Sequence, residues 1–191
     1  MQMLVLGLVL FLGVHSVSIV APGWRERVAA RIGKGPWKGL YALASLIGFV
    51  LLIYGYGLAR QNPIVLYAPP VWTRHLAALL MVPVFPMIFS AYLPGRISAT
   101  LKHPMLVATK LWAVAHLLAN GMLADVVLFA GFLAWAVADR ISLKRRTQPD
   151  LNTAPPRKIN DLIAIVIGLA VYVVFAKWLH LKWIGVYPLP M

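Results

Sequence analysis

The stretch KHPMLVATKLWAVAHLLANG, residues 102–121, is apolar over almost its whole length. About 20 mostly apolar residues in helical form cross the hydrocarbon core of a bilayer. The stretch also contains Lys110 and His116, and an ionisable side chain inside such a segment is costly and usually faces the interior of a helix bundle. It therefore predicts a transmembrane helix whose histidine has a polar partner or a chemical role.

The rest of the chain has the same character. Of its 191 residues, 61% are apolar and 12% are charged, and the mean hydropathy is +0.81, far above that of soluble domains. The apolar runs are continuous rather than alternating, which favours helices over a β-barrel. We predict an all-α protein with a single transmembrane domain over residues 1–191, formed as a compact bundle of six helices. These are expected at residues 3–21, 39–59, 74–93, 104–122, 125–143 and 161–180.

Positive charge is concentrated in alternate loops between these helices. The first, third and fifth loops hold Arg25, Arg27, Arg31, Lys34, Lys38, Arg96, Lys102, Arg140, Lys144, Arg145, Arg146, Arg157 and Lys158. Cytoplasmic loops carry an excess of Lys and Arg, so both termini are predicted to lie on the opposite side of the membrane. This topology, together with the lipid bilayer and its anionic headgroups, accounts for the formal net charge of +13. Binding of nucleic acid is not predicted, because no basic stripe with interleaved aromatic residues lies outside the helices.

The composition also limits the chemistry. The sequence has no cysteine, which excludes Cys-ligated iron–sulfur clusters and thiolate-ligated haem. Its five acidic residues all fall in predicted loops or at helix ends, so a carboxylate metal cage inside the membrane lacks ligands. Asp125 and Asp161 begin their helices, where a carboxylate is expected to cap free N–H groups rather than to catalyse.

The five histidines are the remaining candidates. His15 and His116 lie several residues inside their predicted helices, where burying an ionisable imidazole costs free energy unless it has a polar partner or a function. His103 and His180 lie near helix ends, where water or lipid headgroups can bind them. His75, close to the start of the third helix, is intermediate.

The helical faces around the two internal histidines also differ from plain lipid-facing surface. Residues three and four apart share a face, and the face of His116 includes Thr109, Trp112, Ala113 and Asn120. Two neutral imidazoles on facing helices are suited to clamp a metal porphyrin. The alternative is that each histidine only hydrogen-bonds a neighbouring helix.

Four segments together resemble one family of bacterial integral membrane proteins, the NnrU family. They are GVHSVSIVAPGWRERV (13–28), GLYALASLIGFVLLIYGYGLAR (39–60), KHPMLVATKLWAVAHLLANG (102–121) and LFAGFLAWAVADR (128–140). The resemblance implies a multi-pass protein of the bacterial inner membrane, in which the loop charges place both termini in the periplasm. The family is named for its association with genes of nitrite and nitric oxide reduction, which implies a possible non-enzymatic role in supporting the assembly or expression of denitrification enzymes.

The family is also similar to the plant and cyanobacterial 15-cis-zeta-carotene isomerase, a membrane enzyme that uses haem b. The haem ligands of that enzyme are a histidine in an HS element and a histidine in a W-x-x-x-H element, which match His15 and His116 here. The resemblance therefore implies haem iron held by His15 and His116. Trp112, Ala113 and Asn120, on the helical face of His116, are expected beside it, and His75 is the alternative ligand. It implies redox-linked chemistry on a hydrophobic polyene or a nitrogen oxide, with a small hydrophobic substrate or a redox partner.

The chain departs from that enzyme in two places. Where the isomerase has a cysteine three residues before the second histidine, this chain has Ala113, so a Cys/His ligand switch cannot operate. The RHP element reads Lys102-His103-Pro104, and lysine keeps the charge but loses the planar fork of arginine. A weaker similarity to isoprenylcysteine-type methyltransferases, which share RHP, is not favoured, because HLKWIGVYPLPM (180–191) is too short to enclose S-adenosylmethionine.

Overall fold

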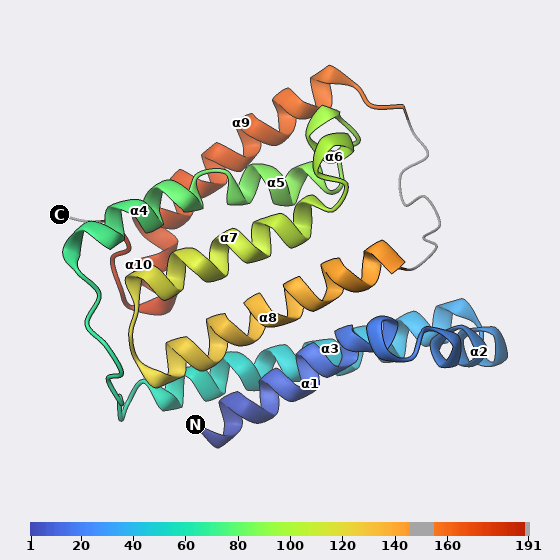
Figure 1. Cartoon of the computed structure of the whole chain (residues 1–191), viewed down its shortest axis with the longest axis horizontal. Coiled ribbons are helices and arrows are strands. Elements are labelled where there is room, and N and C mark those ends of the chain that lie inside the picture. The colour runs from blue at the N-terminus through green and yellow to red at the C-terminus, as the bar shows by residue number, and fades with distance from the viewer. Residues whose placement is uncertain (146–154, 190–191) are drawn as a thin grey trace. The chain divides into compact units, whose positions relative to one another are not determined.

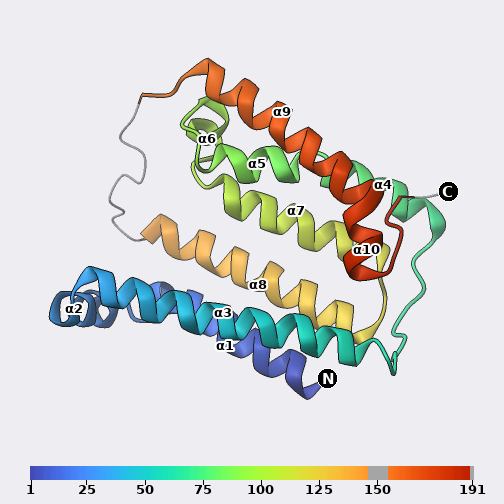
Figure 2. The ribbon, with the colours of Figure 1, turned by 180° about the vertical axis from the view of Figure 1, so that it is seen from behind.

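The computed structural model describes residues 1–145 and 155–189. Its helices are α1 (Gln2–Val20), α2 (Pro22–Ile32), α3 (Lys34–Ala59), α4 (Val71–Met81), α5 (Val84–Ser90), α6 (Arg96–Leu101), α7 (Pro104–Ala119), α8 (Leu123–Arg145), α9 (Lys158–Val174), the π-helical η1 (Phe175–Leu179) and α10 (His180–Ile184). Figures 1 and 2 show these helices from two sides. Extended pairing in the described residues amounts to one isolated bridge, Val65 with Met122. The all-α prediction is confirmed.

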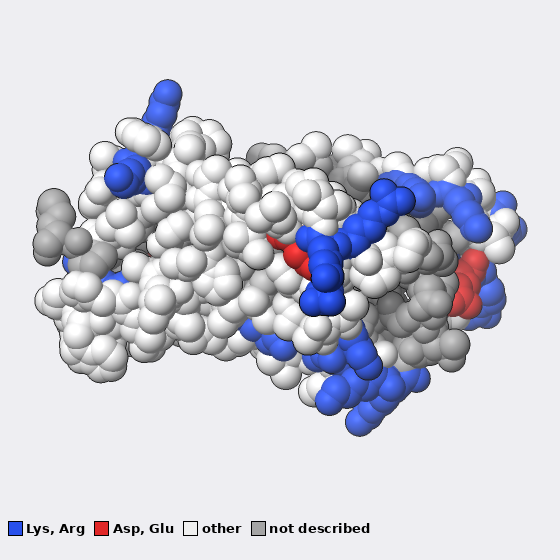
Figure 3. Space-filling model, turned by 90° about the horizontal axis from the view of Figure 1, so that it is seen from above, with Lys and Arg blue, Asp and Glu red and all other residues white. Residues whose placement is uncertain are grey.

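Five apolar helical segments are long enough to cross a membrane within the described part of the chain. They are Gln2–Val20, Lys34–Ala59, Val71–Ser90, Leu123–Arg145 and Lys158–Ile184. The remaining predicted span is α7, which has 16 residues and rises about 24 Å, somewhat less than the roughly 30 Å of a hydrocarbon core. Over the face drawn in Figure 3, most atoms belong to uncharged residues. The fold is a helical membrane bundle.

The predicted helix boundaries need several corrections, and the second helix begins at Lys34 rather than at residue 39. The third predicted span, 74–93, consists of α4 and α5, because Pro83 has no N–H to continue the helix and Val82 N bonds Leu79 O, three residues back, at 3.2 Å. The fourth ends at Ala119 rather than 122, since Asn120 has extended backbone. Loops predicted without structure contain α2 and α6. Arg146, Gln148 and Asp150 of the fifth loop lie outside the described residues.

The contacts divide the chain into two compact units, each described by itself. Unit 1 holds α1, α2, α3 and α8, and unit 2 holds α4 to α7 and α9 to α10. In unit 1, α1 and α3 approach closely at glycines. A Cβ atom on Gly48 would lie 2.7 Å from the Phe11 nitrogen, and one on Gly55 would overlap the backbone of Leu4. Glycine at such crossings lets two helix backbones touch, as membrane helices require for tight packing.

The basic residues of unit 1 gather at one end of its helices. His15 lies against Tyr41 and Leu4 lies against Gly55, so α1 runs antiparallel to α3. Phe11 lies against Phe132 and His15 against Trp135, so α1 runs parallel to α8. The end of α1, the start of α3 and the end of α8 are therefore close in space. That end carries Arg25, Arg27, Arg31, Lys34, Lys38, Arg140, Lys144 and Arg145. The clustering agrees with the loop charges from which the topology was predicted.

In unit 2, α9 packs along α5 and is bonded to α4 at one point. A Cβ atom on Gly168 would overlap Pro86, so α9 and α5 are in backbone contact, and the Tyr172 hydroxyl donates to Ala78 O at 3.0 Å. Near the basic residues Arg96 and Arg157, the backbone of Arg157 bonds Pro94 O at 3.1 Å. The third loop and the start of α9 are therefore on the same side of this unit.

The two carboxylates at helix starts both cap, but not in the same way. Asp125 is buried and accepts the Met122 N–H at 3.1 Å at the start of its own helix α8, and also the Tyr56 hydroxyl at 2.5 Å. Asp161 instead accepts the N–H groups of Arg96, at 2.8 Å, and Ile97, at 3.0 Å. It therefore caps α6, 64 to 65 residues earlier in the chain, rather than its own helix α9.

Candidate functional site

His15 lies in the last third of α1, half-buried within unit 1. Its ring nitrogen Nδ1 is 2.7 Å from the carbonyl oxygen of Phe11, one helical turn earlier. A carbonyl oxygen can only accept a hydrogen bond, so in the neutral ring Nδ1 carries the proton and Nε2 carries the lone pair. The local helix thus fixes both the tautomer and the orientation of the imidazole.

Aromatic rings from all three long helices of unit 1 surround this imidazole. The ring centroids of Phe11, Tyr41 and Trp135 are 4.3, 5.3 and 5.9 Å from that of His15. Trp135 meets the imidazole edge-on, at an interplanar angle of 88°. Rings packed in this way keep water away from the imidazole and restrict its rotation. Tyr41 and Trp135 were not predicted, because sequence does not show which residues of α3 and α8 face α1.

His116, on α7 in unit 2, has the same local geometry. Its Nδ1 is 2.7 Å from the carbonyl oxygen of Trp112, and the two rings are 5.2 Å apart. The Asn120 side chain donates through Nδ2 to the His116 carbonyl oxygen at 2.9 Å, and Ala113 is completely buried. The face predicted from three-and-four spacing thus has Trp112 and Asn120 bonded directly to the histidine residue.

The other histidines have different surroundings. His75, the alternative ligand, is exposed on α4. His103 occupies the residue before α7. The Nδ1 atom of His180 is 2.7 Å from Val186 O in the segment after α10, in an exposed bond. Only His15 and His116, of the five, combine a position within a long apolar helix with a bond to the carbonyl one turn earlier.

Tyr67, in the loop before α4, holds the end of the helix that carries His116. Its hydroxyl group donates to Leu117 O and, at 2.7 Å, to Asn120 O, while its backbone N–H bonds Gly121 O at 3.2 Å. A Cβ atom at Gly121 would overlap the Tyr67 carbonyl oxygen, so only glycine fits there. This clamp was missed from sequence, since no local pattern links residue 67 to the end of α7.

Replacing Tyr67 by phenylalanine should loosen this end of α7. The change leaves two helix-terminal carbonyls without their hydroxyl donor, and losing one such bond costs about 1 kcal/mol of unfolding free energy. Unfolding of the detergent-solubilised protein, followed by far-UV circular dichroism, measures the effect. Tyr92→Phe is the matched control, because Tyr92 is 73% exposed. Equal stability of the two variants would show that the clamp contributes nothing.

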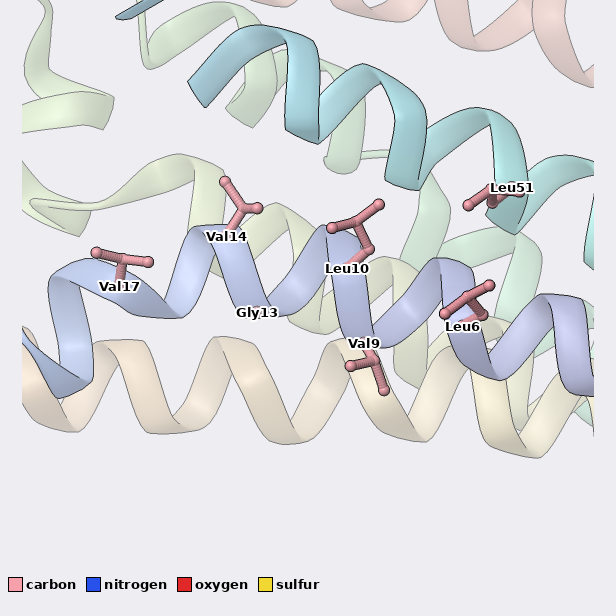
Figure 4. Close-up of a pocket in the computed structure, with 7 residues that line it drawn as sticks. All are labelled: Leu6, Val9, Leu10, Gly13, Val14, Val17 and Leu51. Carbon is pink, nitrogen blue, oxygen red and sulfur yellow. The ribbon is translucent and has the colours of Figure 1, made fainter. Parts of the chain in front are cut away.

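A shallow groove in unit 1 is a separate feature from the histidine. Figure 4 shows its lining side chains along one side of α1, with Leu51 of α3. The lining residues are Leu6, Val9, Leu10, Gly13, Val14, Val17 and Leu51. At 100° per residue, the groove lies on the side of α1 nearly opposite His15. It contains no polar side chain, and such a surface suits lipid acyl chains.

The donor chemistry of the two histidines fits a metal-centred cofactor. Histidines that ligate a metal through Nε2 usually donate Nδ1–H to a carbonyl or carboxylate, as both do here. Within residues 1–145 and 155–189, no three His, Cys, Asp or Glu side chains form a group suited to a metal ion. One imidazole on a helix instead suits a cofactor that brings its own equatorial ligands, such as a porphyrin.

Comparison with known proteins agrees with the sequence motifs. No curated protein and no solved structure matches the chain. One family model, described as NnrU protein, matches residues 3–188, which include both units and both histidine sites. Since this match covers nearly the entire sequence, the chain belongs to the NnrU family of membrane proteins.

Proposed function

We propose that this protein binds haem b in the membrane, with His15 and His116 each supplying an axial nitrogen ligand. The observation that carries the proposal is the bond from Nδ1 to the carbonyl one turn earlier, at 2.7 Å in both residues. That bond leaves Nε2 as the nitrogen with a lone pair and increases its basicity, as in known metal-ligating histidines. The resemblance to a haem-dependent isomerase selects the same two residues.

The residues around each imidazole have defined roles in this proposal. Phe11, Tyr41 and Trp135 hold the His15 ring and exclude water from it. The carbonyl oxygen of Trp112 accepts a hydrogen bond from His116 Nδ1–H, and the Trp112 ring packs against the imidazole. The Asn120 side chain donates to the His116 carbonyl oxygen at the end of α7. When bound, haem b would supply a one-electron couple, or a site for a nitrogen oxide or a hydrophobic polyene if one imidazole dissociated. Ala113 supplies no substitute ligand.

Haem content after purification tests this proposal. The chain is expressed with added haem precursor, purified in detergent and assayed by the pyridine haemochrome spectrum. We expect haem b to copurify with the parent protein, and a variant lacking both His15 and His116 to contain almost none. A parent protein free of haem under these conditions, yet folded by circular dichroism, would contradict the proposal and favour a non-enzymatic membrane factor with packed histidines.

We also propose that both termini lie in the periplasm of a bacterial inner membrane. The basic ends of the helices would then face the cytoplasm, where loops rich in Lys and Arg are retained. A reporter fused after Met191 should show periplasmic activity, and one inserted at Gln148, which lies outside the described residues, should show cytoplasmic activity. Cytoplasmic activity at Met191 would contradict a periplasmic C-terminus.

A further inference from the structure

Two buried side-chain atoms in the described residues have no hydrogen-bond partner. They are the indole nitrogen Nε1 of Trp135 and the hydroxyl oxygen of Ser45, both in unit 1. Buried polar atoms in folded proteins are nearly always paired, and an unpaired one needs an explanation such as an absent ligand or water. Because both atoms belong to unit 1, a polar group bound within that unit would explain them.

The Trp135 ring, which carries one of the unpaired donors, lies beside the His15 ring. The two rings are 5.9 Å apart and nearly perpendicular. An indole N–H can only donate, so whatever satisfies it must be an acceptor. His15 does not serve in this way in the structure, because no bond joins the two residues and the Nε2 lone pair is assigned to iron in the proposed function.

Ser45 faces the same stretch of α1 from the other side. It lies four residues after Tyr41 and three before Gly48, so the three residues share a face of α3. Tyr41 contacts the His15 ring at 5.3 Å, and a Cβ atom on Gly48 would be 2.7 Å from Phe11 N. Ser45 therefore points at α1 between Phe11 and His15. Its hydroxyl group is a second donor.

The surrounding residues indicate that the missing acceptor is negatively charged and that the rest of the ligand is apolar. The basic end of unit 1, defined above by eight Lys and Arg residues, is the end nearest to His15 on α1, Tyr41 on α3 and Trp135 on α8. Because the described residues at this end include only two acidic ones, Glu26 and Asp139, beside the eight basic ones, its charge favours an anion. The ring centroids of Phe49 and Phe132 lie 6.0 and 5.7 Å from that of Phe11. These rings provide apolar surface next to the two donors.

We infer that Trp135 and Ser45 bind the carboxylate of an otherwise apolar ligand. Two sources carry this chemistry. Haem b bears two propionate carboxylates, and in that case the inference rests on the proposed function. A free fatty acid bears one carboxylate, and in that case the inference is independent of the proposed function. In either case, each neutral donor would form a charge-assisted bond to a carboxylate oxygen, which is stronger than a bond between neutral groups.

Esterification separates the carboxylate contact from all others. Haem and haem dimethyl ester are titrated into the parent protein, Trp135→Phe and Ser45→Ala in detergent, and binding is followed at the Soret band. Phenylalanine keeps a ring against His15 but has no N–H. We expect each variant to bind haem about 10-fold more weakly than the parent, relative to its own affinity for the diester. Ser45→Ala, which has no ring contact with His15, should bind the diester as the parent does. Trp72→Phe is the control, because Trp72 is 63% exposed.

The outcomes separate this inference from the proposed function. Suppose that the parent binds haem and that both variants bind haem and the diester as tightly as the parent, or lose affinity for both ligands equally. The carboxylate site is then wrong, while haem binding stands. If the parent binds neither porphyrin, haem binding is wrong, and oleate is compared with methyl oleate by competition with a fluorescent fatty acid. A preference for oleate that Trp135→Phe abolishes then supports the site. No preference for oleate overturns it.

Discussion

His15→Ala and His116→Ala should each lose most of the bound haem. Each change removes the only imidazole that its site offers, and no cysteine is present to replace it. Losing an outer-shell partner of a metal ligand already costs 10- to 100-fold in affinity, so losing the ligand itself should cost about 100-fold or more. Haem retained per chain after dialysis, measured by the pyridine haemochrome spectrum, gives the size of the loss.

Three other histidine variants show whether this loss is specific. His103→Ala and His180→Ala, at helix ends, should keep the parent haem content. His75→Ala is the informative comparison, because His75 is the alternative ligand but is exposed on α4. Added imidazole should restore the spectrum of the His15 and His116 variants if the bundle is still folded. If His75→Ala loses haem while His15→Ala keeps it, His15 is not a ligand.

Gly55→Val should separate α1 from α3. Any Cβ atom at this position would overlap the backbone of Leu4, and backbone cannot move aside as a flexible side chain can. Forcing extra atoms into a packed contact costs about 3 kcal/mol of unfolding free energy, and here it also displaces the helix that carries His15. We therefore expect lower stability together with weaker haem retention.

Gly57→Val on the same helix is the matched control. A Cβ atom on Gly57 would have no neighbour within 4 Å, so this variant carries the same cost of a β-branched residue in a helix without the collision. Denaturation of both variants in a detergent titration, followed by circular dichroism, measures the difference. Similar stability of the two variants would mean that α1 and α3 do not cross at Gly55.

The sequence predicts the local features of the histidine sites and misses their partners on other helices. Depth within an apolar segment selected His15 and His116, and three-and-four spacing placed Trp112 and Asn120 beside His116, where the structure has both. These features depend on one helix at a time. The contacts of Tyr41 and Trp135 with His15 depend instead on how α3 and α8 are aligned with α1. Glycines of α3 that contact the backbone of α1 set that alignment. The local sequence does not show which residues of α1 they contact.

Helix ends show the same division. The predicted span 74–93 averaged over an apolar run and so missed the interruption between α4 and α5, although Pro83 was a visible signal in the sequence. The amphipathic α2 had a signal as well, with Pro22 at its first position. Asp161 had none, because a carboxylate that caps α6 from more than 60 residues away is bonded only through the tertiary fold.

The electron paramagnetic resonance spectrum of the oxidised, haem-loaded parent protein tests the central proposal most directly. Two axial imidazoles produce low-spin ferric iron, whereas a single protein ligand leaves ferric haem largely high-spin. We predict a low-spin signal that becomes high-spin in both His15→Ala and His116→Ala. A high-spin signal in the parent, or a low-spin signal that survives either substitution, would contradict the assignment of these two residues as the axial ligands.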